Sequence, residues 1–275
     1  MTQTHQTILD LYAGFHQEEF LSSDPLEFPH RYSDPHDQEA IAVLASQLAY
    51  GNARLIRKAV QTALTCISES EFHRPRDFVA SLSTHQGLKA ARKNFLPFKY
   101  RFHTGEDVVE LLRLLSRSWS THGSLARHFH LYFRVDQTSI KTGLQGFLSD
   151  WKDWAKLDTK AFQHFLASPQ GGSPCKRWCL FLKWMIRKDK IDLGSWQNPE
   201  WVKRQNQARP EHLIIPLDTH IGRVSRELGL TQRMSDHWKT AVEITCALKN
   251  LDPTDPTKFD FALTRPGILK LKKSK

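Results

Sequence analysis

The sequence lacks any apolar run of the roughly 18–20 residues that a chain needs to cross a bilayer. Its first residues, MTQTHQTILDLY, lack the basic stretch followed by an apolar stretch that marks a secretory signal. Cysteine is scarce, because only Cys66, Cys175, Cys179 and Cys246 are scattered through 275 residues. This scarcity indicates a reducing compartment and argues against a disulfide framework. We therefore expect a cytoplasmic protein with no membrane partner.

Strand-like alternation and internal repeats are also missing, whereas apolar residues recur at helical spacing along most of the chain. With 40% apolar residues, 8 Trp and 16 Phe, the chain can bury a core, which excludes global disorder. The sequence predicts an all-α fold in one globular unit over residues 1–275. Helices are expected within 37–67, with a break at Gly51-Asn52, and over 105–119, 125–133, 139–154, 158–166, 236–251 and 255–268, with connections at 20–36 and 189–212.

Charge balance is missing from the second part of the chain. Residues 1–170 hold 19 Lys and Arg against 18 Asp and Glu, whereas residues 171–275 hold 20 against 11, so nearly all of the net +10 lies in the second part. This asymmetry indicates a polyanionic partner, with nucleic acid as the natural hypothesis. A solvated basic face together with the tail LKLKKSK at 269–275 is the alternative.

Residues 169–188, PQGGSPCKRWCLFLKWMIRK, predict a tight turn followed by an apolar helix. Gly171-Gly172 allow the turn, and Ser173 is a candidate N-cap. Lys176 falls in the first turn, where the helix dipole, the neighbouring Arg177 and the apolar helix body should all favour a free amine over an ammonium. A free amine is the form that a nucleophilic lysine needs.

The alternative for this helix is a basic stripe. Lys176, Lys183 and Arg187 are separated by seven and four residues, so they share one helix face and could all contact phosphate. Trp178 and Trp184 lie on the same helix and are expected in the core.

Residues 213–230, LIIPLDTHIGRVSRELGL, run from a buried segment into a helix. Asp218 is placed to cap that helix, which Gly229 would end. A capping Asp is held ionised in one rotamer, so it could also stabilise a positively charged transition state. Arg223 and Arg226 would lie on the exposed face and suit phosphate contact. His220 is expected to have a structural role.

Four segments of the sequence resemble the helix-hairpin-helix DNA glycosylase superfamily, the group that contains endonuclease III. PLDTHIGRVSRELGL resembles its (V/A)DTH…RV…RLGL segment, whose Asp is catalytic, in a branch with a PLDTH motif. GGSPCKRWCLFL stands where that superfamily carries a Gly-x-Gly-x-Lys hairpin and, in bifunctional members, the Schiff-base lysine. AIAVLASQLAY is similar to its early helix, whose Gln region faces DNA, and KFDFALTRPGI to its closing helix.

The resemblance implies a two-lobed helical fold with DNA in the cleft between the lobes. One lobe would comprise about 37–187 and the other about 1–36 plus 212–275, with 189–211 as an inserted connection. It implies a DNA repair enzyme of base excision repair, a monomer acting on damaged or abasic double-stranded DNA and, in a bacterium, association with the nucleoid. The sequence itself shows no metal-ligand cluster, so we expect no cofactor or metal. Lys176 would form a Schiff base for glycosylase and abasic-site lyase chemistry, with Asp218 as its catalytic partner. The nucleic-acid-binding residues would be Gly171, Gly172, Ser173, Arg177, Lys183, Arg187, Arg223, Arg226 and Gln47.

The sequence departs from that superfamily at the hairpin, which reads QGGSPCK instead of LPGxGxK. No Cys cluster follows the last helix, so we expect no iron–sulfur cluster, and we interpret Cys175 and Cys179 as small buried thiols. The altered hairpin motivates a second hypothesis. In this alternative the protein is a non-catalytic DNA-binding or RNA-binding module that retains the glycosylase scaffold.

Overall fold

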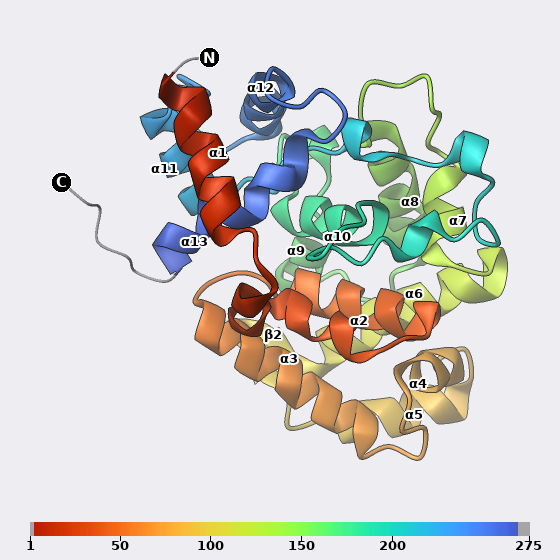
Figure 1. The fold of residues 1–275 in the computed structure, drawn as a ribbon. Helices are drawn as coiled ribbons and strands as arrows, with labels where there is room; N and C mark the ends of the chain where they lie inside the picture. The colour runs from red at the N-terminus through yellow and green to blue at the C-terminus, as the bar shows by residue number, and fades with distance from the viewer. Residues whose placement is uncertain (1–2, 269–275) are drawn as a thin grey trace.

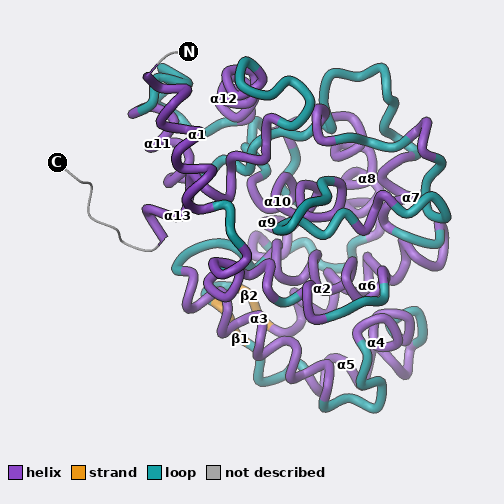
Figure 2. The backbone as a smooth tube through the Cα atoms, viewed as in Figure 1, coloured by secondary structure: helices purple, strands orange, loops and turns teal. Residues whose placement is uncertain are grey.

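Helices make up nearly all of the regular structure of residues 3–268, the part of the chain that the computed structural model describes (Figures 1 and 2). The α-helices are α1 (Gln3–Phe15), α2 (Pro35–Gln47), α3 (Ala53–Ser68), α4 (Pro75–Ser81), α5 (His85–Asn94), α6 (Gly105–His122), α7 (Leu125–His130), α8 (Lys141–Trp154), α9 (Lys160–Phe165), α10 (Lys176–Ile186), α11 (Thr219–Glu227), α12 (Trp238–Lys249) and α13 (Asp260–Ile268). Strands β1 (Lys99–Tyr100) and β2 (His103–Thr104) form a short antiparallel hairpin. The predicted all-α class is confirmed at this level.

The predicted break in the first long helical region is confirmed. Helix α2 ends at Gln47 and α3 begins at Ala53, with the Asn52 side chain accepting a hydrogen bond from the Arg54 amide at 3.0 Å. The sequence analysis missed α1, α4, α5 and the hairpin. Each of these elements is short or carries polar residues between its apolar ones, so its periodicity is weak.

The connection predicted at 20–36 contains no α-helix until α2 begins at Pro35, and the described connection at 189–212 contains none. Both consist largely of 3-10 turns. They are η1 (Glu18–Ser23), η2 (Pro25–Glu27), η3 (Pro29–Arg31), η5 (Ser195–Gln197), η6 (Arg204–Asn206) and η7 (Pro210–His212). The helix predicted from 255 begins with the 3-10 turn η8 (Pro256–Phe259), and α13 starts only at Asp260. Another 3-10 turn, η4 (Pro169–Gly171), precedes α10.

Helices α2 and α10 lie side by side in the core. All side chains of α2 from Glu39 to Gln47 are buried, so the helix is covered on every face. Helix α10 is nearly as deeply buried and carries the buried Trp178 and Trp184, which confirms their predicted place in the core. A helix that is buried all round holds its side chains in fixed positions, and α10 begins with Lys176.

Segments from opposite ends of the chain meet on one side of the molecule. Helix α1 packs against α13, and α11 packs against α13 as well (Figure 1). The basic tail noted at 269–275 lies outside the described residues. Within residues 3–268 no helix is both long and apolar enough to cross a membrane.

Candidate functional site

Lys176 and Asp218, which are far apart in sequence, meet in the structure. The Lys176 Nζ lies 3.2 Å from Asp218 Oδ2 and donates a hydrogen bond to the Ala49 carbonyl oxygen at 3.0 Å. Their side chains are 26% and 23% exposed, so both groups are within reach of a ligand while most of each is shielded. The predicted juxtaposition of these two residues is therefore present.

Asp218 owes its position to the helix that it caps. The backbone amides of His220 and Ile221 each donate to its Oδ1 at 2.9 Å, which makes Asp218 the N-cap of α11, as predicted. Burial alone would raise the pKa of Asp218, but the Lys176 ammonium and the Ile221 amide outweigh it and lower that pKa. Asp218 is therefore an anion at neutral pH.

Lys176 lies in the first turn of α10 as predicted, but it is the first residue of the helix, and the cap differs from the prediction. The N-cap of α10 is Cys175, in the left-handed conformation with φ 49°, and Ser173 accepts a hydrogen bond from the Cys175 amide at 3.2 Å rather than from the helix. Left-handed backbone at a residue other than glycine costs about 1–2 kcal/mol, so the surrounding packing must hold it. The turn before it uses Gly172 at φ 77°, which suits glycine.

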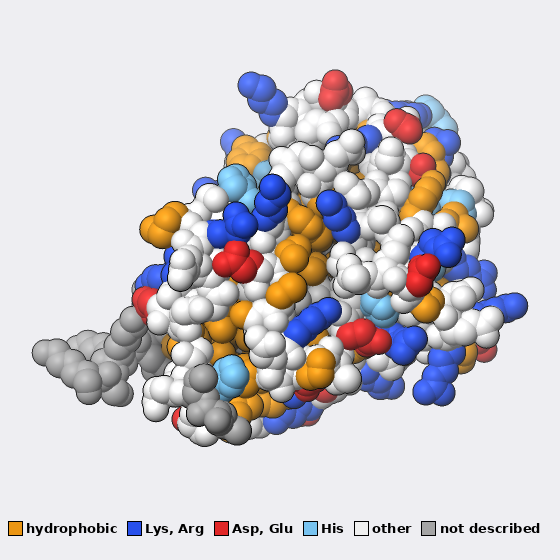
Figure 3. All heavy atoms as spheres, turned by 90° about the horizontal axis from the view of Figure 1, so that it is seen from above, with side chains coloured by type: hydrophobic (Ala, Val, Ile, Leu, Met, Phe, Trp, Pro, Cys, Tyr) orange, Lys and Arg blue, Asp and Glu red, His pale blue; other side chains and the backbone are white. Residues whose placement is uncertain are grey.

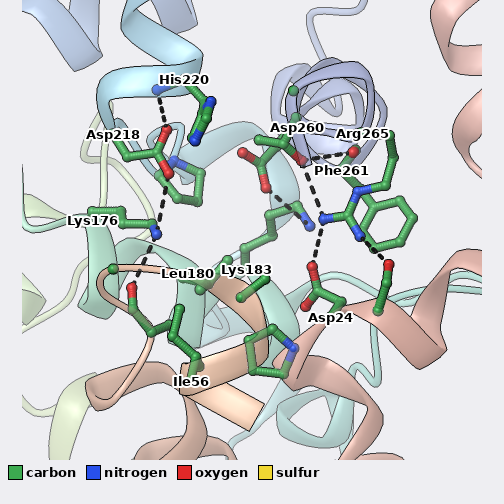
Figure 4. A pocket seen from close by; sticks show the side chains of 18 of the residues that line it. Asp24, Ile56, Lys176, Leu180, Lys183, Asp218, His220, Asp260, Phe261 and Arg265 are labelled. Atoms are coloured by element: carbon green, nitrogen blue, oxygen red, sulfur yellow. Dashed lines mark hydrogen bonds and ion pairs between the residues drawn. The ribbon is translucent and has the colours of Figure 1, made fainter. Parts of the chain in front are cut away.

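A cavity of about 250 Å³ opens beside the Lys176–Asp218 pair (Figure 4). Its walls come from segments far apart in sequence: η1 and η2, the α2–α3 connection, α3, α10, the start of α11, and α13. Ile56, Leu180 and Phe261 supply apolar surface, and His220, which is exposed, lies at the cavity beside Asp218. The cavity combines apolar walls with a few charged groups, as ligand sites do.

Lys183 lies deep in the cavity wall and corrects the prediction of an exposed basic stripe. Its side chain is 1% exposed, and its Nζ lies 3.1 Å from Asp192 Oδ1 and 3.6 Å from Asp260 Oδ2. Burial alone would lower the pKa of Lys183, but these two carboxylates raise it. Burial raises the pKa of Asp260 to about 6 against the opposing effect of Lys183.

Arg187 is likewise internal and not on a phosphate-binding face. It is 3% exposed and pairs with Asp189, Asp192 and Asp255, whose carboxylates lie 2.5, 2.5 and 2.8 Å from its nitrogens. The predicted seven-and-four spacing is real, but the face that these side chains share points into the protein. Their charges are neutralised there, because buried cations require partners.

The opposite wall of the cavity is a buried ion pair. Arg265 is 1% exposed, donates to Asp24 Oδ2 at 2.6 Å, and lies 4.0 Å over the Phe261 ring. The cavity is thus lined by three cationic groups and three acidic ones: Lys176, Lys183, Arg265, Asp24, Asp218 and Asp260. Figure 4 shows these side chains converging from both sides.

Two predicted DNA-facing residues, Arg177 and Gln47, are buried beside the site. The Arg177 guanidinium donates to the carbonyl oxygens of Gln47 and His164, and burial lowers the pKa of Arg177 to about 10. Gln47 is fully buried, and neither side-chain polar atom has a hydrogen-bond partner among the described residues. In this arrangement both residues support the helix pair α2 and α10 rather than face solvent.

The sequence matches a known protein family. The sequence profile of a family described as "Protein of unknown function (DUF2400)" matches residues 24–269. The chain belongs to this family. Comparisons with curated proteins and with solved structures gave no match. The matched range includes Asp24, Lys176, Asp218 and Asp260, all of which line the cavity.

The surface cations are fewer than the sequence suggested. Arg223 is exposed, as predicted, whereas Arg226 is bound to Asp236 at 2.5 Å and donates to the Arg233 and Met234 carbonyl oxygens. Gly171 is exposed, and Gly172 and Ser173 are half-buried, next to Lys176. On the face drawn in Figure 3, Lys and Arg side chains are dispersed among neutral and apolar ones.

Cys175 and Cys179 are buried, as predicted. The Cys175 thiol donates to the Ala167 and Ser173 carbonyl oxygens, and burial raises the pKa of Cys175 to about 12. Both thiols therefore act as small core side chains.

The sequence analysis missed Asp24, Asp192, Asp260 and Arg265. A local signal was available for two of them: Asp192 stands between Ile191 and Leu193, and Asp260 between Phe259 and Phe261. A charged residue flanked by large apolar neighbours is a candidate for burial with a partner. Lys183, between Leu182 and Trp184, carries the same signal.

Proposed function

We propose that this protein is a DNA glycosylase with abasic-site lyase activity, in which Lys176 is the nucleophile and Asp218 its anionic partner. The observation that carries the proposal is the 3.2 Å contact between Lys176 Nζ and Asp218 Oδ2 beside a cavity of about 250 Å³. The resemblance of the DTH segment to the glycosylase superfamily and the surplus of positive charge in residues 171–275 support it.

In the proposed reaction a nucleotide leaves the duplex and enters the cavity. Lys176 first gives up its ammonium proton to solvent, and the neutral amine attacks C1′ of the sugar. The new N–C1′ bond forms, and the glycosidic C–N bond breaks with its electron pair leaving on the base, which takes up the proton that the attacking nitrogen loses. The C1′–O4′ bond then breaks as O4′ gains a proton from solvent, which opens the sugar ring and leaves an iminium between Lys176 and C1′. The iminium loses a C2′ proton, and the 3′ phosphate leaves by β-elimination.

Asp218 suits an electrostatic role in this scheme. Its lowered pKa makes it a weak proton acceptor but a stable anion. An anion fixed by two backbone amides stabilises the cationic sugar of the transition state without needing to reorganise. The Ala49 carbonyl oxygen holds the lysine on its other side, so the amine is aimed by two acceptors.

The cavity suits a single base. Its volume of about 250 Å³ is slightly below the ~300–1,000 Å³ that is typical of pockets for drug-sized ligands. Double-stranded DNA is the proposed partner, with Arg223 and the Gly171–Ser173 turn among the groups at the surface beside it. Monomeric action and a two-lobed arrangement around the cleft are part of the same proposal.

The test is borohydride trapping on a duplex with one abasic site. Reduction of an imine between Lys176 and C1′ would leave a covalent protein–DNA adduct, which should be absent in Lys176→Arg and strongly reduced in Asp218→Asn. Lys239→Arg, a change at an exposed lysine of α12, is the matched control. An adduct that persists in Lys176→Arg would disprove the assignment. Tight binding with no adduct in the wild type would favour the non-catalytic module instead.

A further inference from the structure

The connection between α10 and α11 builds a hollow on the side of the molecule away from the cavity. This stretch, every residue of which the structure describes, forms no α-helix, yet specific contacts hold it in place. The buried Trp196 indole donates to Glu39 at 2.7 Å, and the Gln207 side chain donates to the Val202 carbonyl oxygen at 2.7 Å. A connection this long is uncommon in a compact domain and is usually functional when contacts fix it.

Part of this connection packs against α7. The Arg127 guanidinium donates to the Glu200 and Trp201 carbonyl oxygens at 2.6 and 2.9 Å, and the Ala208 amide donates to His130 Nε2 at 2.9 Å. Figure 1 shows α7 at the right of the molecule, whereas α11 and α13, which help to line the cavity, lie at the left. A ligand bound against α7 would therefore leave the cavity free.

A hollow of about 330 Å³, here called the α7 hollow, opens where the two segments meet. Leu131, Trp201 and Val202 supply its apolar surface, and Leu131 is 63% exposed. Arg127 and Lys203 supply positive charge, whereas no described Asp or Glu lines the hollow. Exposed apolar surface with a polar rim is a feature of protein interaction sites.

The positive charges of the α7 hollow are not neutralised by carboxylates. Arg127 is bound to backbone carbonyl oxygens, and within residues 3–268 neither Arg127 nor Lys203 forms an ion pair. Glu200, the acid nearest to Lys203 in sequence, is exposed but does not line the hollow. A complementary ligand would therefore combine negative charge with an apolar group.

We propose that the α7 hollow binds a short acidic peptide segment of a partner protein. An apolar side chain of the peptide would pack on Leu131, Trp201 and Val202, and its carboxylates would face Arg127 and Lys203. Such contacts draw most of their affinity from a few anchoring side chains, with Trp and Arg enriched among them. The volume of about 330 Å³ suits one anchoring side chain with short flanks. The inference does not depend on the proposed function.

Nucleic acid is the main competing occupant, because it is also anionic. Tight binding of a duplex through its backbone uses about 6–10 phosphate contacts. The described residues that line the α7 hollow include two Lys or Arg side chains, Arg127 and Lys203, and the apolar surface offers nothing to a phosphate. A peptide uses both the charge and the apolar surface, so the peptide is favoured.

The experiment measures the binding of fluorescently labelled peptides by anisotropy. Each peptide of the panel carries Leu, Phe or Trp between two Asp residues on each side, and in its matched peptide Lys replaces Asp. At least one acidic peptide should bind the wild type about tenfold more tightly than its basic match, since like charges across a contact cost affinity. Added salt should reduce that difference.

Two substitutions test the residues assigned to the α7 hollow. Leu131→Asp places a carboxylate on the apolar surface and should weaken acidic-peptide binding about tenfold, whereas Leu131→Met should bind like the wild type. Lys203→Glu should weaken binding of the acidic peptide and strengthen binding of the basic one, a reversal that a loss of folded structure does not produce. Leu96→Asp and Lys239→Glu, at exposed residues that do not line the hollow, are the matched controls and should bind both peptides like the wild type.

Three results would overturn the proposal. In the first, no peptide of the panel binds the wild type at millimolar concentration, and in the second, acidic and basic peptides bind it equally. In the third, Leu131→Asp and Lys203→Glu bind the acidic peptide as tightly as the wild type does. Displacement of the bound peptide by a duplex oligonucleotide would assign the α7 hollow to nucleic acid and would overturn the proposal too. These measurements need no abasic-site chemistry, so a failure of borohydride trapping leaves them unaffected.

Discussion

The carboxylate of Asp218 faces Lys176 with one oxygen and the helix α11 with the other. Oδ2 lies 3.2 Å from Lys176 Nζ, whereas Oδ1 accepts the backbone hydrogen bonds that begin α11. The two roles can therefore be separated by substitution, because one depends on charge and the other on a hydrogen-bond acceptor.

Asp218→Asn should keep the cap and lose the charge. Asn caps helices about as well as Asp, so the free energy of unfolding should fall by less than about 1 kcal/mol. Trapping should slow by roughly 10²-fold or more, as expected when one preorganised electrostatic partner is removed. Asp218→Ala, which removes both roles, should cost about 1 kcal/mol more in urea unfolding. Equal trapping rates in Asp218→Asn and the wild type would contradict the catalytic role.

Lys183→Met should destabilise the fold strongly. The substitution leaves Asp192 and Asp260 buried without their cation, and removing one partner of a buried pair costs about 3–5 kcal/mol. Urea denaturation at pH 7 measures the loss. Lys239→Met, at an exposed lysine of α12, should change the unfolding free energy by no more than about 0.5 kcal/mol. Equal changes in unfolding free energy at the two lysines would show that the ion pairs of Lys183 with Asp192 and Asp260 do not stabilise the fold.

His130 should make the fold sensitive to acid. Its Nδ1 donates to the Ala126 carbonyl oxygen at 2.7 Å, and its Nε2 accepts from the Ala208 amide at 2.9 Å, so only the neutral ring fits. Burial lowers the pKa of His130 to about 4 from an ordinary value near 6.5. The unfolded chain therefore gains a proton first as the pH falls.

The stabilisation from neutral His130 should be complete above pH 6.5 and be lost between about pH 6.5 and 4. His130→Gln lacks this titration, so the advantage of the wild type in unfolding free energy should shrink from pH 7 to pH 5. Chemical denaturation at the two pH values gives both numbers. A constant difference would mean that His130 binds a proton equally well in the folded and the unfolded chain.

Gly51→Ala should disturb the link between cavity and hairpin. Gly51 has φ 97°, and an added Cβ would lie 2.7 Å from an Arg101 guanidinium nitrogen. The strain of that backbone conformation should destabilise the fold by about 1–3 kcal/mol. Gly14→Ala in α1 has open space around it, and alanine is the better helix former, so it should be neutral or stabilising by up to about 1 kcal/mol. Thermal unfolding of the two variants provides the comparison.

The sequence predicted the pairing of Lys176 with Asp218 because each of the two residues stands in a recognisable local pattern. Asp218 stands where an apolar segment turns into a helix, and Lys176 where a glycine turn does so. Helix periodicity likewise predicted α2, α3, α6 and α8, whose apolar residues repeat over several turns.

The remainder of the cavity could not be predicted in the same way. Lys183 and Arg187 have the spacing of an exposed basic stripe, and only the positions of Asp192, Asp255 and Asp260 turn that stripe inward. Ion pairs between residues far apart in the chain leave no periodic signal. The large apolar residues on either side of such a charged residue indicate its burial instead, and helical periodicity takes no account of them.

The pairing of Asp24 with Arg265 has a consequence for how the protein is made. These two residues are 241 positions apart, and both line the cavity beside Lys176 and Asp218. During synthesis, a nascent chain that has α2 and α10 in place still lacks α13, so it has no complete site until Arg265 has left the ribosome. Contacts of such long range are also slow to form. The newborn protein should therefore acquire its cavity last, after its buried helices have already packed.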